Sequence, residues 1–363
     1  MSVPPLRHWL LGLTLSLAGA WAAGALFLDT VQPVVFDPQV RRWVAQPDTV
    51  FRSRSEGWAS SRAGVHGIRG LPGGKLPEGP KVVFWGDSFV EAMQVDDAVR
   101  MAQAFTRLAA DSGLQDSGQG LCGVGIGTGG DSLIDSLFKL PDYAPVLGPV
   151  TLHVFFLGKI SDVLPDIPHD CRAIFRSAPE LALVPAPGCP PNVLAQRLAP
   201  TFRSLELAGA YDIYRKLQAL DLRLRPGPVL SPSPVAAASG SGPPASPEGA
   251  WTFLLAELVQ RAKGPVLLVY APTLPRLERG QARQDDAEDG AALAFARTCQ
   301  RQGVPFVDLG PAFAEHFRAT GRLPRGFSHS PPGTGHLNAD GHRMAAAAVV
   351  AHLKEQAHAL LAR

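Results

Sequence analysis

Five short apolar runs, rich in β-branched and aromatic residues, follow one another in the part of the chain after residue 80. They cover residues 82–85, 123–126, 150–157, 266–270 and 304–309. In each run both alternating sets of side chains are apolar, which is typical of parallel strands covered by helices on both faces. The runs therefore predict the five strands of a buried parallel sheet.

Segments with helical spacing of apolar residues lie between these runs. They cover residues 98–112, 251–263, 287–302 and, at the end, about 340–361. Alternating strands and helices form right-handed crossover units, because a parallel strand can be reached only through a crossover connection. The pattern predicts a doubly wound α/β domain over residues 77–363.

Two segments do not fit this alternation. Residues 29–76 show little periodicity and are interpreted as a lead-in segment that lies against the domain. Residues 165–249 are interpreted as an insertion between the third and fourth strands. Within it, residues 226–247 consist mainly of Pro, Ser, Ala and Gly. Such a run buries too little apolar surface to become ordered, so disorder is predicted there.

An uncharged, mostly apolar run occupies residues 9–28. Twenty residues of helix rise about 30 Å, the thickness of a bilayer core. Small residues between 18 and 25 also offer Ala-x-Ala cleavage sites, so a signal anchor and a removed signal peptide both remain open. Either alternative predicts an extracytoplasmic domain in the periplasm or cell envelope. It is tethered to the membrane through residues 9–28 if the run is not cleaved, and secreted if it is.

The charge balance and the cysteine count exclude several classes of protein. Lys and Arg number 34 and Asp and Glu 32, for a net charge of +2, whereas a nucleic-acid binder needs a strong basic surplus. Four cysteines without C-x-x-C spacing exclude a disulfide framework or a zinc ribbon. In an exported chain, a disulfide between Cys171 and Cys189 is predicted, because it would restrict a Pro-rich stretch.

The sequence Gly86-Asp87-Ser88-Phe89 follows directly after the first predicted strand. Active sites of open α/β sheets form at this carboxyl edge. A serine at a helix start can present its hydroxyl beside free backbone N–H groups, which stabilise an oxyanion. The alternative interpretation is that Ser88 is only the N-cap of the following helix.

A second polar motif, Thr334 to His342, precedes the last predicted helix. His336 lies in the loop and can reach back over the sheet edge as a base. His342 falls within the helix pattern and is interpreted as structural, and Asn338 and Asp340 as helix caps. No metal and no cofactor are predicted. The histidines lack an accompanying set of carboxylates or cysteines, and the glycines between 123 and 130 lack a Walker Lys-Ser/Thr.

Together the two motifs resemble those of the SGNH hydrolases, also called the GDSL family. The resemblance spans about residues 81–357 without the insertion. It implies a three-layer fold with a flavodoxin-like, five-stranded parallel sheet. It also implies that Ser88 is the nucleophile, that His336 is the general base, and that the N–H groups of Ser88 and Gly125 bind the oxyanion.

The sequence departs from the family pattern at two positions. After Gly158 the family has Asn-Asp, and here Lys159-Ile160-Ser161-Asp162 follows. Two replacements for the asparagine remain open: Lys159, which can donate to the oxyanion as a cation, and Ser161, if the loop is longer. The family's acid precedes its histidine by two or three residues, where this chain has Thr334 and Gly333. Two replacements for that acid remain open: Thr334 can accept a hydrogen bond from the imidazole, or a carboxylate from elsewhere in the chain can take its place. Asp308, at the end of the fifth predicted strand, is one candidate for such a carboxylate.

The resemblance implies an exported serine esterase or an acyltransferase of the same fold. Its implied substrate is a small ester or an acylated, often acetylated, carbohydrate. The alternative is a catalytically impaired SGNH-like domain that binds a glycan or a partner in the cell envelope, because the acid and the oxyanion asparagine are replaced. A third interpretation assigns the function to residues 226–247 as a docking segment.

Overall fold

The computed structural model describes most of the chain outside the insertion. The described residues are 6–27, 29–30, 32–54, 56–163, 173–176, 182–185, 247–273, 275–278, 281–283, 289–328 and 333–361. Part of the predicted insertion is a hairpin of β10 (Ala173–Arg176) and β11 (Ala182–Pro185). The predicted Cys171–Cys189 disulfide lies outside the described residues, as does the predicted disordered run except for Pro247, where helix α7 begins.

The central sheet has five parallel strands. They are β5 (Lys81–Gly86), β8 (Cys122–Gly127), β9 (Val150–Leu157), β12 (Val266–Tyr270) and β15 (Phe306–Asp308). Their order across the sheet is β15-β12-β9-β5-β8, which in chain order is the flavodoxin-like arrangement 2-1-3-4-5. The predicted fold class is therefore confirmed. The strand order reverses beside β5, so the switch point lies where β5 and β9 end.

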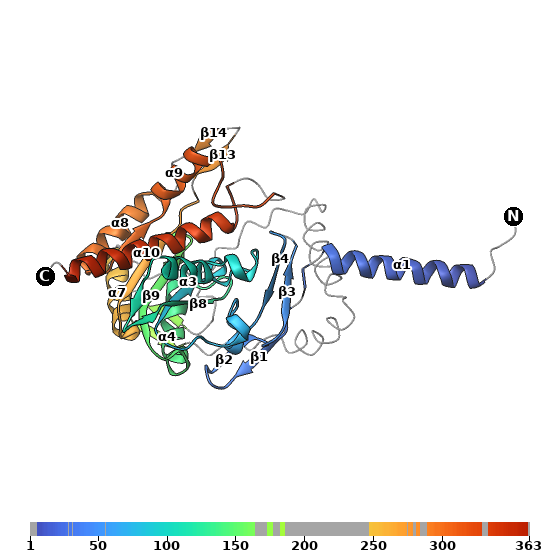
Figure 1. The fold of residues 1–363 in the computed structure, drawn as a ribbon, viewed down its shortest axis with the longest axis horizontal. Helices are drawn as coiled ribbons and strands as arrows, with labels where there is room; N and C mark the ends of the chain where they lie inside the picture. Colours follow the sequence, from blue (N-terminus) through green and yellow to red (C-terminus); the bar gives the residue numbers. More distant parts are fainter. Residues whose placement is uncertain are drawn as a thin grey trace.

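Helices cover both faces of this sheet and make three layers (Figure 1). One face packs against α4 (Leu133–Leu147), α7 (Pro247–Ala262) and α8 (Asp289–Arg301). The other face packs against α3 (Met101–Asp111), α9 (Gly310–Thr320) and α10 (Ala339–Leu361). All six residues of β5 are buried, which explains why the strand reads as a continuous apolar run.

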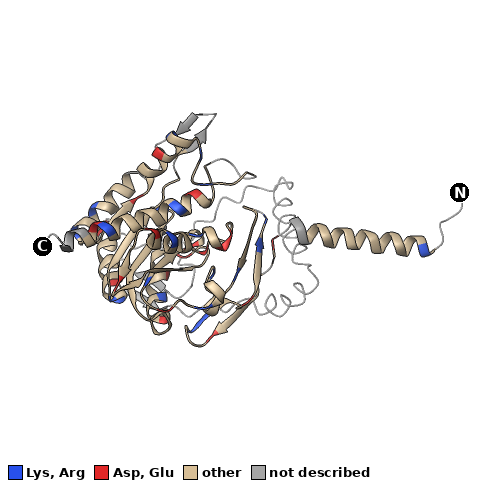
Figure 2. Cartoon of the chain, in the orientation of Figure 1, with Lys and Arg blue, Asp and Glu red and all other residues tan. Residues whose placement is uncertain are grey.

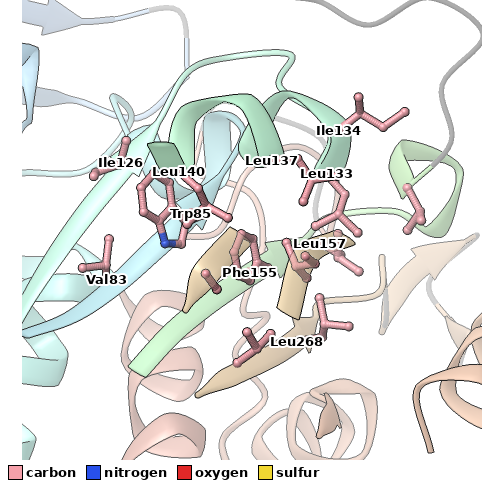
Figure 3. Close-up of a cluster of buried hydrophobic side chains, with 14 of the residues drawn as sticks. Val83, Trp85, Ile126, Leu133, Ile134, Leu137, Leu140, Phe155, Leu157 and Leu268 are labelled. Carbon is pink, nitrogen blue, oxygen red and sulfur yellow. The ribbon is translucent and has the colours of Figure 1, made fainter. Parts of the chain in front are cut away.

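The core on the α4 face is built around Trp85 of β5 (Figure 3). The Trp85 ring stacks on Phe155 with ring centroids 6.2 Å apart, and its indole N–H donates to Nδ1 of His153 at 3.0 Å. The largest core side chain therefore has its polar atom satisfied. Burial lowers the pKa of His153 to about 4, so this histidine is neutral in the core.

The lead-in segment forms two hairpins that pack against the domain. The first pairs β1 (Val34–Asp37) with β2 (Arg42–Ala45), and the second pairs β3 (Val50–Ser53) with β4 (Ala59–Arg62). Arg42 anchors the first hairpin by an ion pair of 3.0 Å with Asp142 of α4, in which both side chains are largely buried. The second hairpin reaches the carboxyl edge of the sheet, where its loop takes part in the candidate site.

Helix α1 (Leu6–Phe27) contains most of the apolar run of residues 9–28. It extends away from the sheet (Figure 1), and its only Lys or Arg is Arg7 in the first turn (Figure 2). Within the described residues, no helix combines the length and hydropathy that crossing a membrane requires.

Candidate active site

Ser88 lies at the carboxyl end of β5, as the first residue of the short helix α2 (Ser88–Glu91). The N-cap of α2 is Asp87, whose carboxylate accepts a hydrogen bond of 2.9 Å from the N–H of Phe89. The alternative interpretation of Ser88 as an N-cap is therefore wrong. Because Asp87 performs the capping, the Ser88 hydroxyl remains available for another partner.

Two glycines allow α2 to pack closely against the ends of the neighbouring strands. A Cβ on Gly86 would lie 2.8 Å from the Val90 side chain and 3.0 Å from the carbonyl oxygen of Phe156. A Cβ on Gly127, which pairs with Gly86 across the sheet, would overlap the backbone of α2. Only residues without a side chain permit this close packing. The α2 turn is thereby fixed against the ends of β8 and β9.

His336 lies in the loop before α10 and reaches the serine. Its Nε2 is 2.9 Å from Oγ of Ser88, and its ring contacts Phe89 with ring centroids 5.4 Å apart. The loop is held on both sides of the histidine. The His336 carbonyl accepts from the N–H of Gly326 at 2.9 Å, and the guanidinium of Arg325 donates to the Gly335 carbonyl at 3.1 Å. The structure thus brings together the two residues that the motifs singled out.

Glu56, from the loop between β3 and β4, completes the arrangement. Its Oε2 is 2.5 Å from Nδ1 of His336, and its Oε1 accepts from the His336 backbone N–H at 2.8 Å. Gly335 has a positive φ of +78°, and a Cβ there would overlap Oε1 of Glu56. Ser88, His336 and Glu56 therefore form a hydroxyl–imidazole–carboxylate chain with the connectivity of a serine-hydrolase triad.

The prediction of Asp308 as the acid is wrong, because Glu56 occupies Nδ1 of His336. Asp308 is exposed at the end of β15, and its Oδ1 accepts from the N–H of Gly310 at 2.8 Å. It accepts from the first residue of α9 at the far edge of the sheet, three strands away from β5. Sequence reasoning missed Glu56 because it lies 280 residues before His336 in a segment without periodicity.

Of the two backbone N–H groups predicted to bind the oxyanion, that of Ser88 lies at the site and that of Gly125 does not. Ser88 is the first residue of α2, so its N–H has no acceptor within the helix. Gly125 does not lie beside it: it is inside β8, paired with Phe84, because the strand continues to Gly127. The glycine next to Ser88 is Gly129, where a Cβ would lie 3.8 Å from the serine Cβ. The N–H of Gly129 donates to Glu91 at 2.8 Å.

Lys159 is exposed in the turn that follows β9. This turn approaches α2 closely, because a Cβ on the preceding residue, Gly158, would overlap the Phe89 ring. The third predicted oxyanion segment therefore lies beside the Ser88 turn. The role of Lys159 itself stays a prediction.

The second histidine of the motif has a different environment. His342 is 1% exposed in α10, and burial together with nearby Arg100 lowers its pKa to about 3. It is therefore neutral near pH 7. Asn338 caps α10 as expected, since its Oδ1 accepts from the N–H groups of Asp340 and Gly341. In the described part of the chain, no three His, Cys, Asp or Glu side chains are grouped to hold a metal ion.

The described part of the chain has a 2-1-3-4-5 parallel sheet, a serine after the first strand of that sheet and a histidine before the last helix. This is the arrangement that the resemblance to SGNH hydrolases implied. No family model matches the chain, and no curated protein matches it.

Solved structures match it at low identity. An acetyl xylan esterase, AlAXEase, has a TM-score of 0.37 and 14% identity over 75% of this chain and 98% of its own. A catalytic mutant of the acetylxylan esterase Axe2 from Geobacillus stearothermophilus has a TM-score of 0.37 and 13% identity over 76% and 94%. A lipolytic G-D-S-L family protein from Veillonella parvula has a TM-score of 0.32 and 10% identity over 74% and 95%.

Proposed function

We propose that the chain is a serine esterase that removes an acyl group, in the simplest case acetyl, from an esterified carbohydrate. The observation that carries the proposal is the continuous chain of contacts from Ser88 through His336 to Glu56, at 2.9 and 2.5 Å. The carbohydrate part of the proposal is supported by the resemblance to SGNH hydrolases alone.

The geometry supports a two-step acyl transfer. His336 takes the proton of the Ser88 hydroxyl through Nε2 while Oγ attacks the acyl carbon. The carboxylate of Glu56 accepts from Nδ1–H and stabilises the imidazolium that forms. The tetrahedral intermediate then collapses, the alcohol leaves with the proton from His336, and an acyl-serine remains. Water, activated by the same histidine, releases the acid and restores the serine.

The developing oxyanion needs donors on the side of the acyl carbon opposite the base. The Ser88 N–H at the start of α2 is one such donor. The N–H of Gly129, the glycine beside Ser88, is bonded to Glu91, so it would serve as a second donor only after leaving that carboxylate. Each donor of this kind contributes about 3 kcal/mol to lowering the barrier. An acyltransferase would use the same acyl-serine, with a second alcohol in place of water.

Two substitutions test the function. Ser88→Ala is expected to abolish hydrolysis of 4-nitrophenyl acetate, and His336→Ala to reduce it by at least a thousandfold, because each removes a reacting group. Ser60→Ala is the matched control, since Ser60 is exposed on β4. The proposal is overturned if the Ser88→Ala protein retains the activity of the unsubstituted protein.

The alternative, an impaired domain that only binds a glycan or a partner, rests on two replaced residues of the family pattern, the acid and the oxyanion asparagine. The carboxylate of Glu56 at His336 favours the enzyme instead. Labelling with a fluorophosphonate distinguishes the two, because only an activated serine reacts.

Export of the domain stays a prediction from the apolar run of residues 9–28.

A further inference from the structure

A large aromatic residue, Trp58, follows Glu56 by two positions in the loop between β3 and β4. Trp58 is 60% exposed, although tryptophan is a residue that folding normally covers. It belongs to the loop of residues 54–58, which joins β3 to β4 and also carries Glu56. The same five-residue loop therefore presents a carboxylate to His336 and an indole to solvent.

The indole is held in place rather than loosely exposed. The guanidinium of Arg54 lies over the Trp58 ring, 4.5 Å from its centroid. That guanidinium is fixed in turn, because it donates to the carbonyls of Ser53 at 2.6 Å and Ala59 at 2.8 Å across the neck of the loop. A cation over an aromatic face is attractive, and here it supports the ring from one side.

The loop backbone is also fixed against the domain. Gly57 has a φ of +74°, and a Cβ there would overlap the carbonyl of Gln94, three residues after α2 ends. Glu56 anchors the other side of the loop through its two bonds to His336. A rigid aromatic surface binds a ligand without a large entropy cost, because little ordering is needed on binding.

We propose that Trp58 is a stacking platform for a sugar ring of the substrate, next to the ester that Ser88 attacks. This inference rests on the proposed function and specifies its carbohydrate part. The ring face of a pyranose carries C–H groups that pack on an aromatic ring, while its hydroxyls point outward to polar partners. Few other substrates combine an apolar face and a polar rim in one flat unit.

The charges around Trp58 favour this occupant over an acyl chain. Arg52, Asp29 and Asp96 interact electrostatically with Arg54, whose guanidinium lies over the indole, so charged groups gather at the base of the loop that carries Trp58. A long acyl chain would desolvate these groups without offering hydrogen bonds, which is costly. Sugar hydroxyls can donate to the carboxylates and accept from the guanidinium groups.

Steady-state kinetics on three substrates test the platform: partially acetylated xylo- and cello-oligosaccharides, 4-nitrophenyl acetate and 4-nitrophenyl octanoate. In Trp58→Ala, kcat/KM for an acetylated oligosaccharide is expected to fall at least tenfold more than for 4-nitrophenyl acetate, through KM. Trp58→Phe keeps an aromatic face and is expected to recover most of the loss. Trp43→Ala is the matched control, because Trp43 is also exposed, at 44%, but lies on β2 of the other hairpin.

Three results would overturn the platform. One is an equal loss on the oligosaccharides and 4-nitrophenyl acetate, which means that the loop was merely displaced. Another is a selective loss on the octanoate, which assigns Trp58 to an acyl chain. The last is a protein that hydrolyses 4-nitrophenyl acetate but no acetylated oligosaccharide. Each of these results would contradict the role of Trp58 but not the proposed esterase activity of Ser88. Activity that survives in Ser88→Ala would contradict the proposed function itself.

Discussion

The carboxylate of Glu56 accepts from two different groups of the same histidine, the ring Nδ1 and the backbone N–H. This arrangement fixes the ring orientation and places the proton on Nδ1. Nε2 is then left as an acceptor toward the hydroxyl of Ser88, at 2.9 Å. A single carboxylate thus sets both the tautomer and the position of the His336 imidazole, the proposed base.

Glu56→Gln is predicted to lower kcat on 4-nitrophenyl acetate by about 10²–10⁴. The two oxygens of Glu56 each accept from one N–H of His336, but a glutamine side chain has only one oxygen. Either the ring N–H or the backbone N–H of His336 would therefore face the amide NH₂, which cannot accept. The serine-labelling rate with a fluorophosphonate should fall with it. Asp308→Asn is the control, because Asp308 lies at the far edge of the sheet. If instead Asp308→Asn is the damaging change, Glu56 is not the acid.

The predictable site residues were those with a local motif. Ser88 follows a buried strand and His336 precedes a helix, and both neighbours have strong apolar periodicity that locates them at the sheet edge. Glu56 has no such neighbour, since its contact depends on how a distant hairpin docks. Gly125 was misplaced for a related reason: the glycines of β8 alternate within the strand, so the pattern does not show where the strand ends.

At the scale of elements, a buried polar cluster joins the β3–β4 hairpin to the α2 turn. The guanidinium groups of Arg69 and Arg100 both donate to Oγ of Ser61 in β4, at 3.1 and 2.7 Å. Arg69 also lies 3.7 Å from the carboxylate of Glu91 in α2, which holds Gly129. Burial lowers the pKa of Arg69, and that of Arg100 to about 10. The hairpin with Glu56 is thereby fixed to the helix with Ser88.

Arg69→Leu is predicted to reduce the free energy of unfolding by about 3–5 kcal/mol, because it leaves a largely buried Glu91 without this partner. It should also lower kcat, since the hairpin that positions Glu56 loosens. Urea denaturation and 4-nitrophenyl acetate kinetics measure the two effects. Arg62→Leu on β4 is the control: its pair with Asp48 is exposed and 4.0 Å long, which is worth about 0–1 kcal/mol. Equal destabilisation by both changes would contradict the role of the cluster.

The lead-in hairpins could not be predicted as elements for a physical reason. Each strand is only four residues long, and β4 is Ala-Ser-Ser-Arg, whose buried positions are Ala59 and Ser61. Ser61 is polar although it is buried, so the strand shows no alternation of apolar and polar residues. Its burial is possible because Arg69 and Arg100 donate hydrogen bonds to its hydroxyl, which no sequence pattern shows. The central strands β5, β9 and β12 were predictable because helices on both faces bury nearly all of their side chains.

At the scale of the whole molecule, the site combines three distant parts of the chain. The loop of residues 54–58, the turn of residues 86–91 and the loop of residues 333–338 meet at the switch point of the sheet. The proposed activity therefore depends on the docking of segments from both halves of the sequence. Anything that destabilises the shared core is therefore expected to affect the site as well. Low pH is one such influence, because a histidine that is buried in its neutral form makes the stability of the core depend on pH.

His153→Gln is predicted to weaken the loss of stability in acid. The pKa of His153 is about 4 in the folded protein and about 6.5 when unfolded, so the unfolded state binds more protons between these values. The contribution of neutral His153 to the free energy of unfolding is present above pH 6.5 and is lost as the pH falls. The loss between pH 7 and pH 5 is about 2 kcal/mol. Glutamine can still accept from Trp85 without titrating. Urea unfolding at both pH values should show that difference, with exposed His8→Gln as the control; an unchanged pH dependence in His153→Gln would show that this histidine is not buried neutral.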